Sequence, residues 1–184
     1  MVRKNAKILI EQALINLLQD MPLDKIDVQD IASSANLSRQ TFYYNFKNKQ
    51  DLLCWILEQD MGQAVDAFRR SSRINDFISA ALSIFRDKYI LYRSIAASEN
   101  KRRACSAYFE NGVINCARIM ETRSTFGRMT SALWESLYFF TYGASGMILH
   151  WLENGMQQSP EQLTNTIISN MPSALDRYFL VSVG

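Results

Sequence analysis

The sequence predicts an all-α protein in which three short amino-terminal helices are joined by a long helix to a larger helical bundle. Only three prolines and seven glycines interrupt its 184 residues. Few segments alternate apolar and polar residues as half-buried strands do, and apolar residues recur at helical spacing along most of the chain. We therefore expect two parts, residues 1–50 and residues 51–184, which share a helix over residues 49–70.

The amino-terminal part is predicted to begin with a helix from about Lys4 to Gln19, which is closed at Pro22. One face of this helix carries apolar residues at spacings of three and four, namely Ile10, Ala13, Leu14, Leu17 and Leu18. Pro22 ends the helix because the residue before a proline disfavours the helical backbone conformation.

Two short helices follow, separated by a tight turn. Asp27 is suited to cap the second helix and Ser38 the third, because their side-chain oxygens can accept hydrogen bonds from the backbone of the first turn. Asn36 lies where the chain must reverse, and asparagine tolerates the left-handed backbone conformation better than most residues. Phe42 and Phe46 lie on one side of the third helix, which leaves its other side polar.

The carboxy-terminal part is predicted to consist of longer helices. Their expected ranges are 73–95, 99–123, 127–154 and 160–181. The segment from Ser136 to Leu152 carries no formal charge, but it contains two glycines and several hydroxyl side chains. A membrane-spanning helix needs roughly 20 predominantly apolar residues. We therefore interpret this segment as a helix buried by its own core and by a partner chain.

The positive charge is concentrated rather than abundant. The formal net charge is only +2, so binding to nucleic acid cannot be inferred from the total. Residues 36–50 nevertheless hold three basic side chains and no acidic one, as do residues 1–10, where the basic residues are Arg3, Lys4 and Lys7. The positions of these charges, and not their sum, favour a nucleic-acid partner.

The predicted third helix carries residue types that read DNA. In a helix-turn-helix, the first turn of this helix reaches deepest into the major groove. Residues 39–41 are an arginine, a glutamine and a threonine. Arginine pairs with guanine, glutamine pairs with adenine, and the threonine methyl group contacts thymine. Tyr43, Lys47 and Lys49 are placed to hold phosphates.

The run from Asp27 to Leu53, with its ending Phe-Tyr-Tyr-Asn-Phe-Lys-Asn-Lys-Gln-Asp-Leu, resembles the DNA-binding signature of TetR-type bacterial transcription regulators. The resemblance extends over residues 5–55. It implies that DNA is contacted by Gln29, Thr41, Tyr43 and Lys49. The chain departs from the family pattern at Asn36, where a glycine is usual, and at Asn45, where a histidine is usual. Altogether, the expected DNA-binding residues are Gln29, Ser38, Arg39, Gln40, Thr41, Tyr43, Asn45, Lys47 and Lys49.

The resemblance also implies an architecture and a function for the remainder of the chain. Members of the family are all-helical homodimers whose variable carboxy-terminal domain binds a small molecule and whose last two long helices form the dimer. The segment from Tyr142 to Gly155 resembles the same region of dihydroxyacetone-kinase-regulator-like members. We therefore expect a ligand-responsive regulator, a repressor on family grounds, that binds a palindromic double-stranded DNA operator as a homodimer in the cytoplasm.

Several residues allow two interpretations. The aromatic set Trp134, Tyr138, Phe139, Phe140 and Tyr142 lines either the core or a ligand cavity. His150 is interpreted as a partly buried, hydrogen-bonded side chain beside Trp151, and a lone histidine is a poor metal site. The three cysteines, Cys54, Cys105 and Cys116, are widely separated and odd in number, which favours a reducing cytoplasm over a disulfide scaffold.

Two other classes of protein were weighed against the regulator. An enzyme is disfavoured, because no nucleophile–base pair, phosphate-binding glycine loop or clustered carboxylates appear in the sequence, and neither a cofactor nor a metal is expected. A co-regulator that keeps the helix-turn-helix fold but acts through a protein partner stays open, because residues 1–52 carry 7 basic and 6 acidic side chains.

Overall fold

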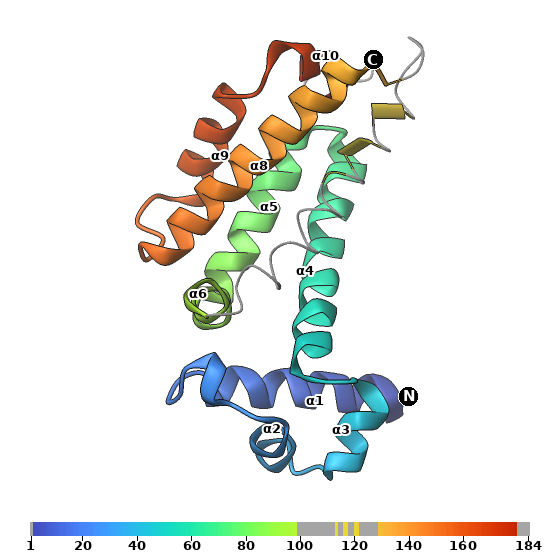
Figure 1. Cartoon of the computed structure of the whole chain (residues 1–184), viewed down its shortest axis with the longest axis vertical. Coiled ribbons are helices and arrows are strands. Elements are labelled where there is room, and N and C mark those ends of the chain that lie inside the picture. Colours follow the sequence, from blue (N-terminus) through green and yellow to red (C-terminus); the bar gives the residue numbers. More distant parts are fainter. Residues whose placement is uncertain (1, 99–112, 114–115, 118–119, 122–128, 180–184) are drawn as a thin grey trace. The chain divides into compact units, whose positions relative to one another are not determined.

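The computed structural model describes residues 2–98, 113, 116, 117, 120, 121 and 129–179. Every regular element in these residues is a helix, which confirms the predicted fold class (Figure 1). In chain order the elements are α1 (Val2–Leu17), η1 (Leu23–Lys25), α2 (Val28–Ser34), α3 (Arg39–Asn45), α4 (Lys49–Ser71), α5 (Ile74–Asp87), α6 (Tyr89–Ala97), α8 (Ser131–Glu153), α9 (Pro160–Ser169), η2 (Ser173–Leu175) and α10 (Asp176–Phe179). The elements labelled η are 3₁₀ helices.

The described residues divide into two compact units. The head unit comprises those of Met1–Gln59 and Lys88–Ala104, and the bundle unit comprises those of Asp60–Asp87 and Cys105–Gly184. The chain passes from one unit to the other inside α4 and again directly after α5. The head unit therefore includes α6, which follows α5 in the sequence.

The head unit is organised by α1, α2 and α3, which pack against one another. The side chains at its centre are almost completely buried, and they include Ile10, Leu14, Ile26, Ile31, Phe42, Leu52 and Ile56. Each such side chain contributes about 1.5–3 kcal/mol through removal of apolar surface from water. Because these residues come from α1, the turn after η1, α2, α3 and the start of α4, one apolar core orients all three short helices.

Hydrogen bonds from side chains define where α2 begins. The backbone N–H of Asp30 donates to Oδ1 of Asp27, and the backbone N–H of Asp27 donates to Oδ2 of Asp30, each at 2.9 Å. This reciprocal capping box satisfies donors that the first turn of a helix leaves unpaired. The predicted capping role of Asp27 is confirmed.

The turn after α2 depends on a left-handed residue. Asn36 has a φ of 54°. With this conformation, the N–H of Leu37 donates to the carbonyl of Ala32 at 2.9 Å, and the N–H of Asn36 donates to the carbonyl of Ser33 at 3.1 Å. These two bonds are the pattern by which helices commonly end at a glycine. Asparagine fills that position here, as the sequence predicts.

The predicted helix over residues 73–95 is wrong, because the chain forms two helices there. Lys88 lies between α5 and α6 with φ −98° and ψ 37°, outside the helical conformation. Its ammonium pairs with Oε1 of Glu11 on α1 at 2.7 Å, and Leu91 and Tyr92 are buried after it. Contacts made with the head unit thus override the continuous helical pattern of the sequence.

The last predicted helix, over residues 160–181, is also wrong in its extent. Pro172 interrupts it after α9, because proline lacks a backbone N–H and restricts the residue before it. α8 begins at Ser131 rather than at 127, and Oγ1 of Thr130 accepts a hydrogen bond from its first turn. The predicted helix over 99–123 lies mostly outside the described residues.

The turn at Asn36 yields a stability prediction. Replacing Asn36 with alanine keeps a β-carbon in the left-handed region but removes the side-chain amide that makes this conformation tolerable for asparagine, and we expect a loss of about 1 kcal/mol. Asn36→Gly removes the steric cost and should keep stability within about 0.5 kcal/mol of the parent. Urea unfolding followed by circular dichroism measures both. Equal destabilisation by the two variants would contradict the assigned backbone conformation.

Candidate DNA-binding interface

α3 has one buried face and one exposed face. Phe42 and Phe46 are 0% and 2% exposed and point into the head core. The exposed side carries Ser38, Arg39, Gln40, Tyr43 and Tyr44. The ring of Tyr43 meets that of Phe42 edge-on, with centroids 5.7 Å apart. Its phenol end is thereby held at the surface, next to the polar residues of the first turn.

Ser38 and Thr41 serve the helix itself. Oγ of Ser38 accepts a hydrogen bond from the backbone N–H of Thr41 at 3.0 Å, and the two hydroxyl groups lie 2.9 Å apart. Ser38 is therefore the N-cap of α3, as predicted. Because Thr41 is half-buried and its hydroxyl is engaged, its methyl group is the part available for an apolar contact.

Gln29 and Asn45 direct their side-chain amides along their own helices. Nε2 of Gln29, on the exposed side of α2, donates to Oγ of Ser33 at 2.9 Å. Nδ2 of Asn45 donates to the carbonyl of Thr41 at 2.8 Å, and Oδ1 of Asn45 is buried without a hydrogen-bond partner among the described residues. The amide of Asn45, which lies where the resemblance leads us to expect a histidine, thus bonds to the backbone of its own helix.

Two lysines near the start of α4, for which the sequence predicts the same role, have different surroundings in the structure. Lys47 is exposed, and its backbone N–H donates to Oδ2 of Asp51 at 2.8 Å. Asn48 completes this cap, because its Oδ1 accepts from the N–H of Asp51 at 2.9 Å. Lys49 is half-buried, and its Nζ donates to the backbone carbonyls of the turn before α2.

Two further charges are shaped by their surroundings. The ammonium of Lys7 lies over the rings of Phe46 and Trp55, 4.8 Å and 5.2 Å from their centroids. The backbone N–H of Asp30 holds the pKa of Asp27 below its ordinary value, and the positive charge of Arg39 acts in the same direction. The side chains of Arg3 and Lys4, part of the predicted basic amino terminus, lie outside the described ones.

Tyr44 was missed by the sequence-based set. It is 68% exposed on α3, and its exposure makes it a further candidate for contact with phosphate or sugar. The signal in the sequence is its position directly after Tyr43, on the polar side of a helix whose apolar side is set by Phe42 and Phe46. The exposed set of α3 is therefore larger than predicted.

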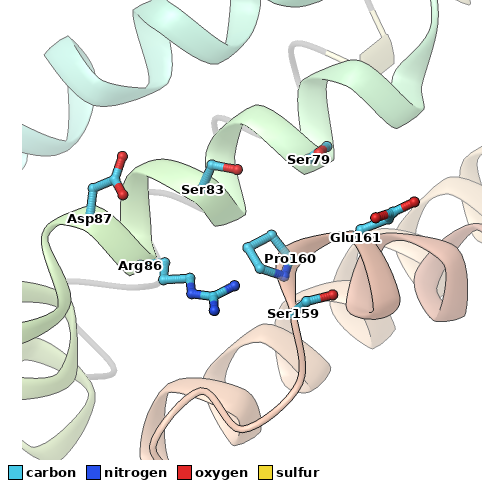
Figure 2. Close-up of a pocket in the computed structure, with 7 residues that line it drawn as sticks. All are labelled: Ser79, Ser83, Arg86, Asp87, Ser159, Pro160 and Glu161. Atoms are coloured by element: carbon cyan, nitrogen blue, oxygen red, sulfur yellow. The ribbon is translucent and has the colours of Figure 1, made fainter.

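In the bundle unit, a polar groove of about 450 Å³ lies between α5 and α9. Its lining residues are Ser79, Ser83, Arg86, Asp87, Ser159, Pro160 and Glu161. Figure 2 shows Arg86 extending from α5 toward Ser159 and Pro160 at the start of α9. Effector pockets for small molecules are mostly apolar and enclose their ligand. This groove has neither property, and we assign no ligand to it.

The predicted aromatic set of α8 divides between buried and exposed positions. Phe140 is buried and Trp134 is half-buried, whereas Tyr138, Phe139 and Tyr142 are 46%, 74% and 58% exposed. The exposed three therefore lie outside the core formed by the described residues. Gly143 and Gly146 lie on the same helix, and nothing comes within 4 Å of a β-carbon built on either of them.

The remaining candidates are the histidine and the cysteines, and those that are described are ordinary surface or partly buried side chains. The expected partial burial of His150 is wrong: its side chain is exposed, and its Nδ1 lies 3.2 Å from the amide nitrogen of Asn154. Burial raises the pKa of the Cys116 thiol to about 12, so this thiol is a poor nucleophile at neutral pH. Cys54 is half-buried, and Cys105 lies outside the described residues.

The described residues contain neither a metal-binding cluster nor a membrane-spanning helix. Within those ranges, no group of three or more His, Cys, Asp or Glu side chains is arranged to hold a metal ion. None of the helices described is both long and apolar enough to span a membrane.

Sequence comparisons match the two parts of the chain separately. A family model described as "Bacterial regulatory proteins, tetR family" matches residues 10–54. DhaS of Lactococcus lactis subsp. lactis, a transcriptional activator of the dhaKLM operon, is 38% identical over 58 residues, 32% of this chain and 31% of that protein. EthR of Mycobacterium tuberculosis, a transcriptional regulator, is 45% identical over 49 residues, 27% of this chain and 23% of that protein. The matches span less than a third of the length of either relative.

Solved structures resemble the whole chain. The dihydroxyacetone kinase operon activator DhaS has a TM-score of 0.66 at 19% identity, covering 95% of this chain and 98% of that one. The fatty acid degradation regulator FadR of Bacillus halodurans has a TM-score of 0.62 at 15% identity, covering 92% and 96%. At these identities the likeness shows a shared fold.

More than half of the chain, residues 72–172, matches a family model described as "Transcriptional regulator C-terminal region" and designated as a TetR carboxy-terminal type. This match follows the amino-terminal one along the chain. Together with the capped helix-turn-helix of the head unit, it places the protein among transcription regulators rather than enzymes. The chain belongs to the TetR family of bacterial transcription regulators.

Proposed function

We propose that the protein is a ligand-responsive repressor that acts in the cytoplasm and binds a palindromic operator as a homodimer. Residues 1–50 would serve as the DNA-binding domain and residues 51–184 as the effector-binding and dimerisation domain. The observation that carries the proposal is the capped α3, whose exposed side carries Arg39, Gln40 and Tyr43 while its other side is locked in the core.

Each head would place α3 in the major groove, with half-sites about 34–36 Å apart. Arg39 and Gln40 lie in the first turn and are exposed. They therefore suit direct reading of base edges. Tyr43 and the exposed Lys47 suit contacts with the phosphate backbone on either side. Gln29 on α2 and Asn45 at the end of α3 remain in the proposed interface, although their amides bond within their own helices.

The decisive experiment is selection of fragments from the protein's own genome by the purified chain, with and without candidate metabolites. A promoter fusion to a selected fragment then gives the sign of regulation. Repression requires reporter output to rise when the protein is deleted. The relative DhaS is named an activator, so a fall in reporter output on deletion would replace repression with activation and leave DNA binding intact.

Substitutions of Arg39 and Lys47 distinguish contacts that read bases from contacts that bind phosphates. Arg39→Ala should weaken operator binding by about 1–3 kcal/mol and relax the preference at one base position per half-site. Lys47→Ala should weaken binding to all sequences alike, and should reduce the slope of log K against log salt by about 0.9 per head. Fluorescence anisotropy at several salt concentrations, with operators altered one base at a time, measures both. Identical behaviour of the two variants would argue against these roles.

Ser38 allows folding and DNA binding to be changed independently. Ser38→Ala removes the cap and should cost about 1 kcal/mol of stability. Ser38→Asp keeps a capping oxygen, and its charge favours a helix N-terminus, but the carboxylate would face the phosphates. We therefore expect Ser38→Asp to match the parent in thermal unfolding while losing operator binding. Unimpaired binding by this variant would place the N-terminus of α3 away from DNA.

We propose that the homodimer forms through α8 and α9. The residues that favour this interface lie on α8. Tyr138, Phe139 and Tyr142 form an exposed aromatic row, with the rings of Tyr138 and Tyr142 stacked at 6.2 Å. Contiguous exposed apolar surface of this kind marks interaction sites. The bare glycines of the same helix, Gly143 and Gly146, permit close approach of a second helix.

Phe139 tests the dimer. Phe139→Glu places a charge in the aromatic row and should shift the protein from dimer to monomer in sedimentation velocity, because burial of an unpaired carboxylate is costly. Gln12→Glu, at an exposed position of α1, adds the same charge elsewhere and should leave the dimer unchanged. A Phe139→Glu variant that remains dimeric would exclude this row from the interface.

The effector response is proposed to reach the heads through α4 and α6. α4 is shared by both units, and α6 follows directly on α5 of the bundle unit. Both ends of α6 are tied to the head: Lys88 pairs with Glu11 at 2.7 Å, and Oγ of Ser98 donates to Oδ1 of Asp24 at 2.6 Å. A ligand that binds one state better would shift the population of DNA-competent heads.

The co-regulator is the second candidate, because the charge balance of the head is modest. It predicts that the isolated homodimer binds operator and random DNA equally. Retained discrimination between the two, by the chain alone, rules it out.

A further inference from the structure

Lys49 stands apart from the other basic residues of the candidate interface because its ammonium points into the protein. It is the first residue of α4. Nζ donates to the carbonyl of Leu23 at 2.6 Å and to the carbonyl of Ile26 at 2.5 Å. Both acceptors belong to η1 and its C-cap, more than twenty residues earlier in the chain. The contact joins two segments that no backbone hydrogen bond connects in the described residues.

The acceptors lie in the turn that leads into α2. Ile26 directly precedes Asp27, the N-cap of α2. The side chains of Leu23 and Ile26 are buried at 4% and 1% exposure, so this turn carries polar carbonyls next to the head core. A buried carbonyl without a partner is costly. The carbonyl of Leu23 also accepts from the N–H of Ile26 at 3.3 Å. The ammonium of Lys49 is therefore a second donor to Leu23 and a donor to Ile26, and it joins the turn before α2 to the start of α4.

The charge of Lys49 is likewise directed toward the protein. Burial lowers its pKa, and the carboxylates of Asp24, Asp27 and Asp30 act in the opposite direction and favour the charged form. These three acidic residues lie around the turn and the first turn of α2. Two of the three N–H donors of the ammonium are engaged by backbone carbonyls of the same unit.

We propose that Lys49 is a positioning residue for operator binding, which holds the start of α2 and so sets the position of Gln29 and the packing of α2 on α3. This role rests on the proposed DNA binding of the head. It replaces the direct phosphate contact expected for this position from the sequence. Lys47, two residues earlier and exposed, is the lysine that remains available to the phosphate backbone.

Lys49→Met and Lys47→Met form a matched pair at the same helix start. Lys49→Met should weaken operator binding about tenfold while leaving the slope of log K against log salt unchanged. Lys47→Met should lower that slope by about 0.9 per head, or about 1.8 for two heads. Operator binding by both variants is measured at a temperature well below the midpoint of their thermal unfolding. A slope loss for Lys49→Met equal to that of Lys47→Met would overturn the proposal.

A double-mutant cycle with Gln29 separates positioning from mere stabilisation. If Lys49 acts through α2, the effect of Gln29→Ala on operator affinity should largely vanish in the Lys49→Met background, whereas the effect of Arg39→Ala should persist. Additive effects of Lys49→Met and Gln29→Ala would reduce Lys49 to a structural residue and overturn the proposal.

Lys49→Gln covers the case in which the methionine variant does not fold. Its amide keeps a donor for a carbonyl but carries no charge, so it should retain more affinity than Lys49→Met, with an unchanged salt slope. Loss of slope in Lys49→Gln would instead indicate a phosphate contact.

Amide hydrogen exchange of the full chain without DNA keeps this inference distinct from the proposed function. Either variant should speed exchange at the start of α2 selectively and leave α1 protected. If the parent itself shows no sequence-selective binding, the proposed function fails, and the exchange result still decides whether Lys49 holds the turn. Unchanged exchange at α2 would overturn the positioning role.

Discussion

The exposed side of α3, which we propose faces DNA, depends on the burial of its opposite side. Phe42 and Phe46 are inserted into a core that also holds residues from α1, α2 and α4. A seven-residue helix is too short to be stable by itself in water. Tertiary packing therefore supplies most of its stability, and the same packing sets its rotation. Arg39 and Gln40 face outward because the phenylalanines on the other side of the helix face inward.

Several charged side chains of the head unit interact with neighbouring groups of the same unit, and these interactions compete with contacts to a partner. Asp27 and Asp30 are engaged in the capping box, Lys49 is bonded to backbone carbonyls, and Lys7 lies over two aromatic rings. Among the described side chains of the head, Arg39 and Lys47 remain exposed on and beside α3. Under the proposed function, operator recognition by such a head would rely on shape, base contacts and the pairing of two heads more than on total positive charge.

The chain connects the bundle unit to the head unit inside α4 and again between α5 and α6. α4 belongs to both units, and α5 leads directly into α6, which is held by Glu11 of α1 and Asp24 of η1. The break at Lys88 makes this possible, because a continuous helix over 73–95 would carry residues 89–97 onward along the axis of α5. In the proposed mechanism, this local interruption would give the bundle unit a second connection to the head unit, besides α4.

The sequence by itself determined the all-α class, the helix-turn-helix and its caps, because these depend on short-range spacing and on hydrogen bonds between residues three apart, as at Asp27 and Ser38. The turn at Asn36 was predictable for the same reason. Only the tertiary structure decided which polar residues face outward, where helical patterns break at Lys88, and that Tyr44 is exposed. It also separated Lys47 from Lys49. Their sequence environments are nearly identical, but the acceptors of Lys49 lie more than twenty residues away in the chain, where no local pattern could reveal them.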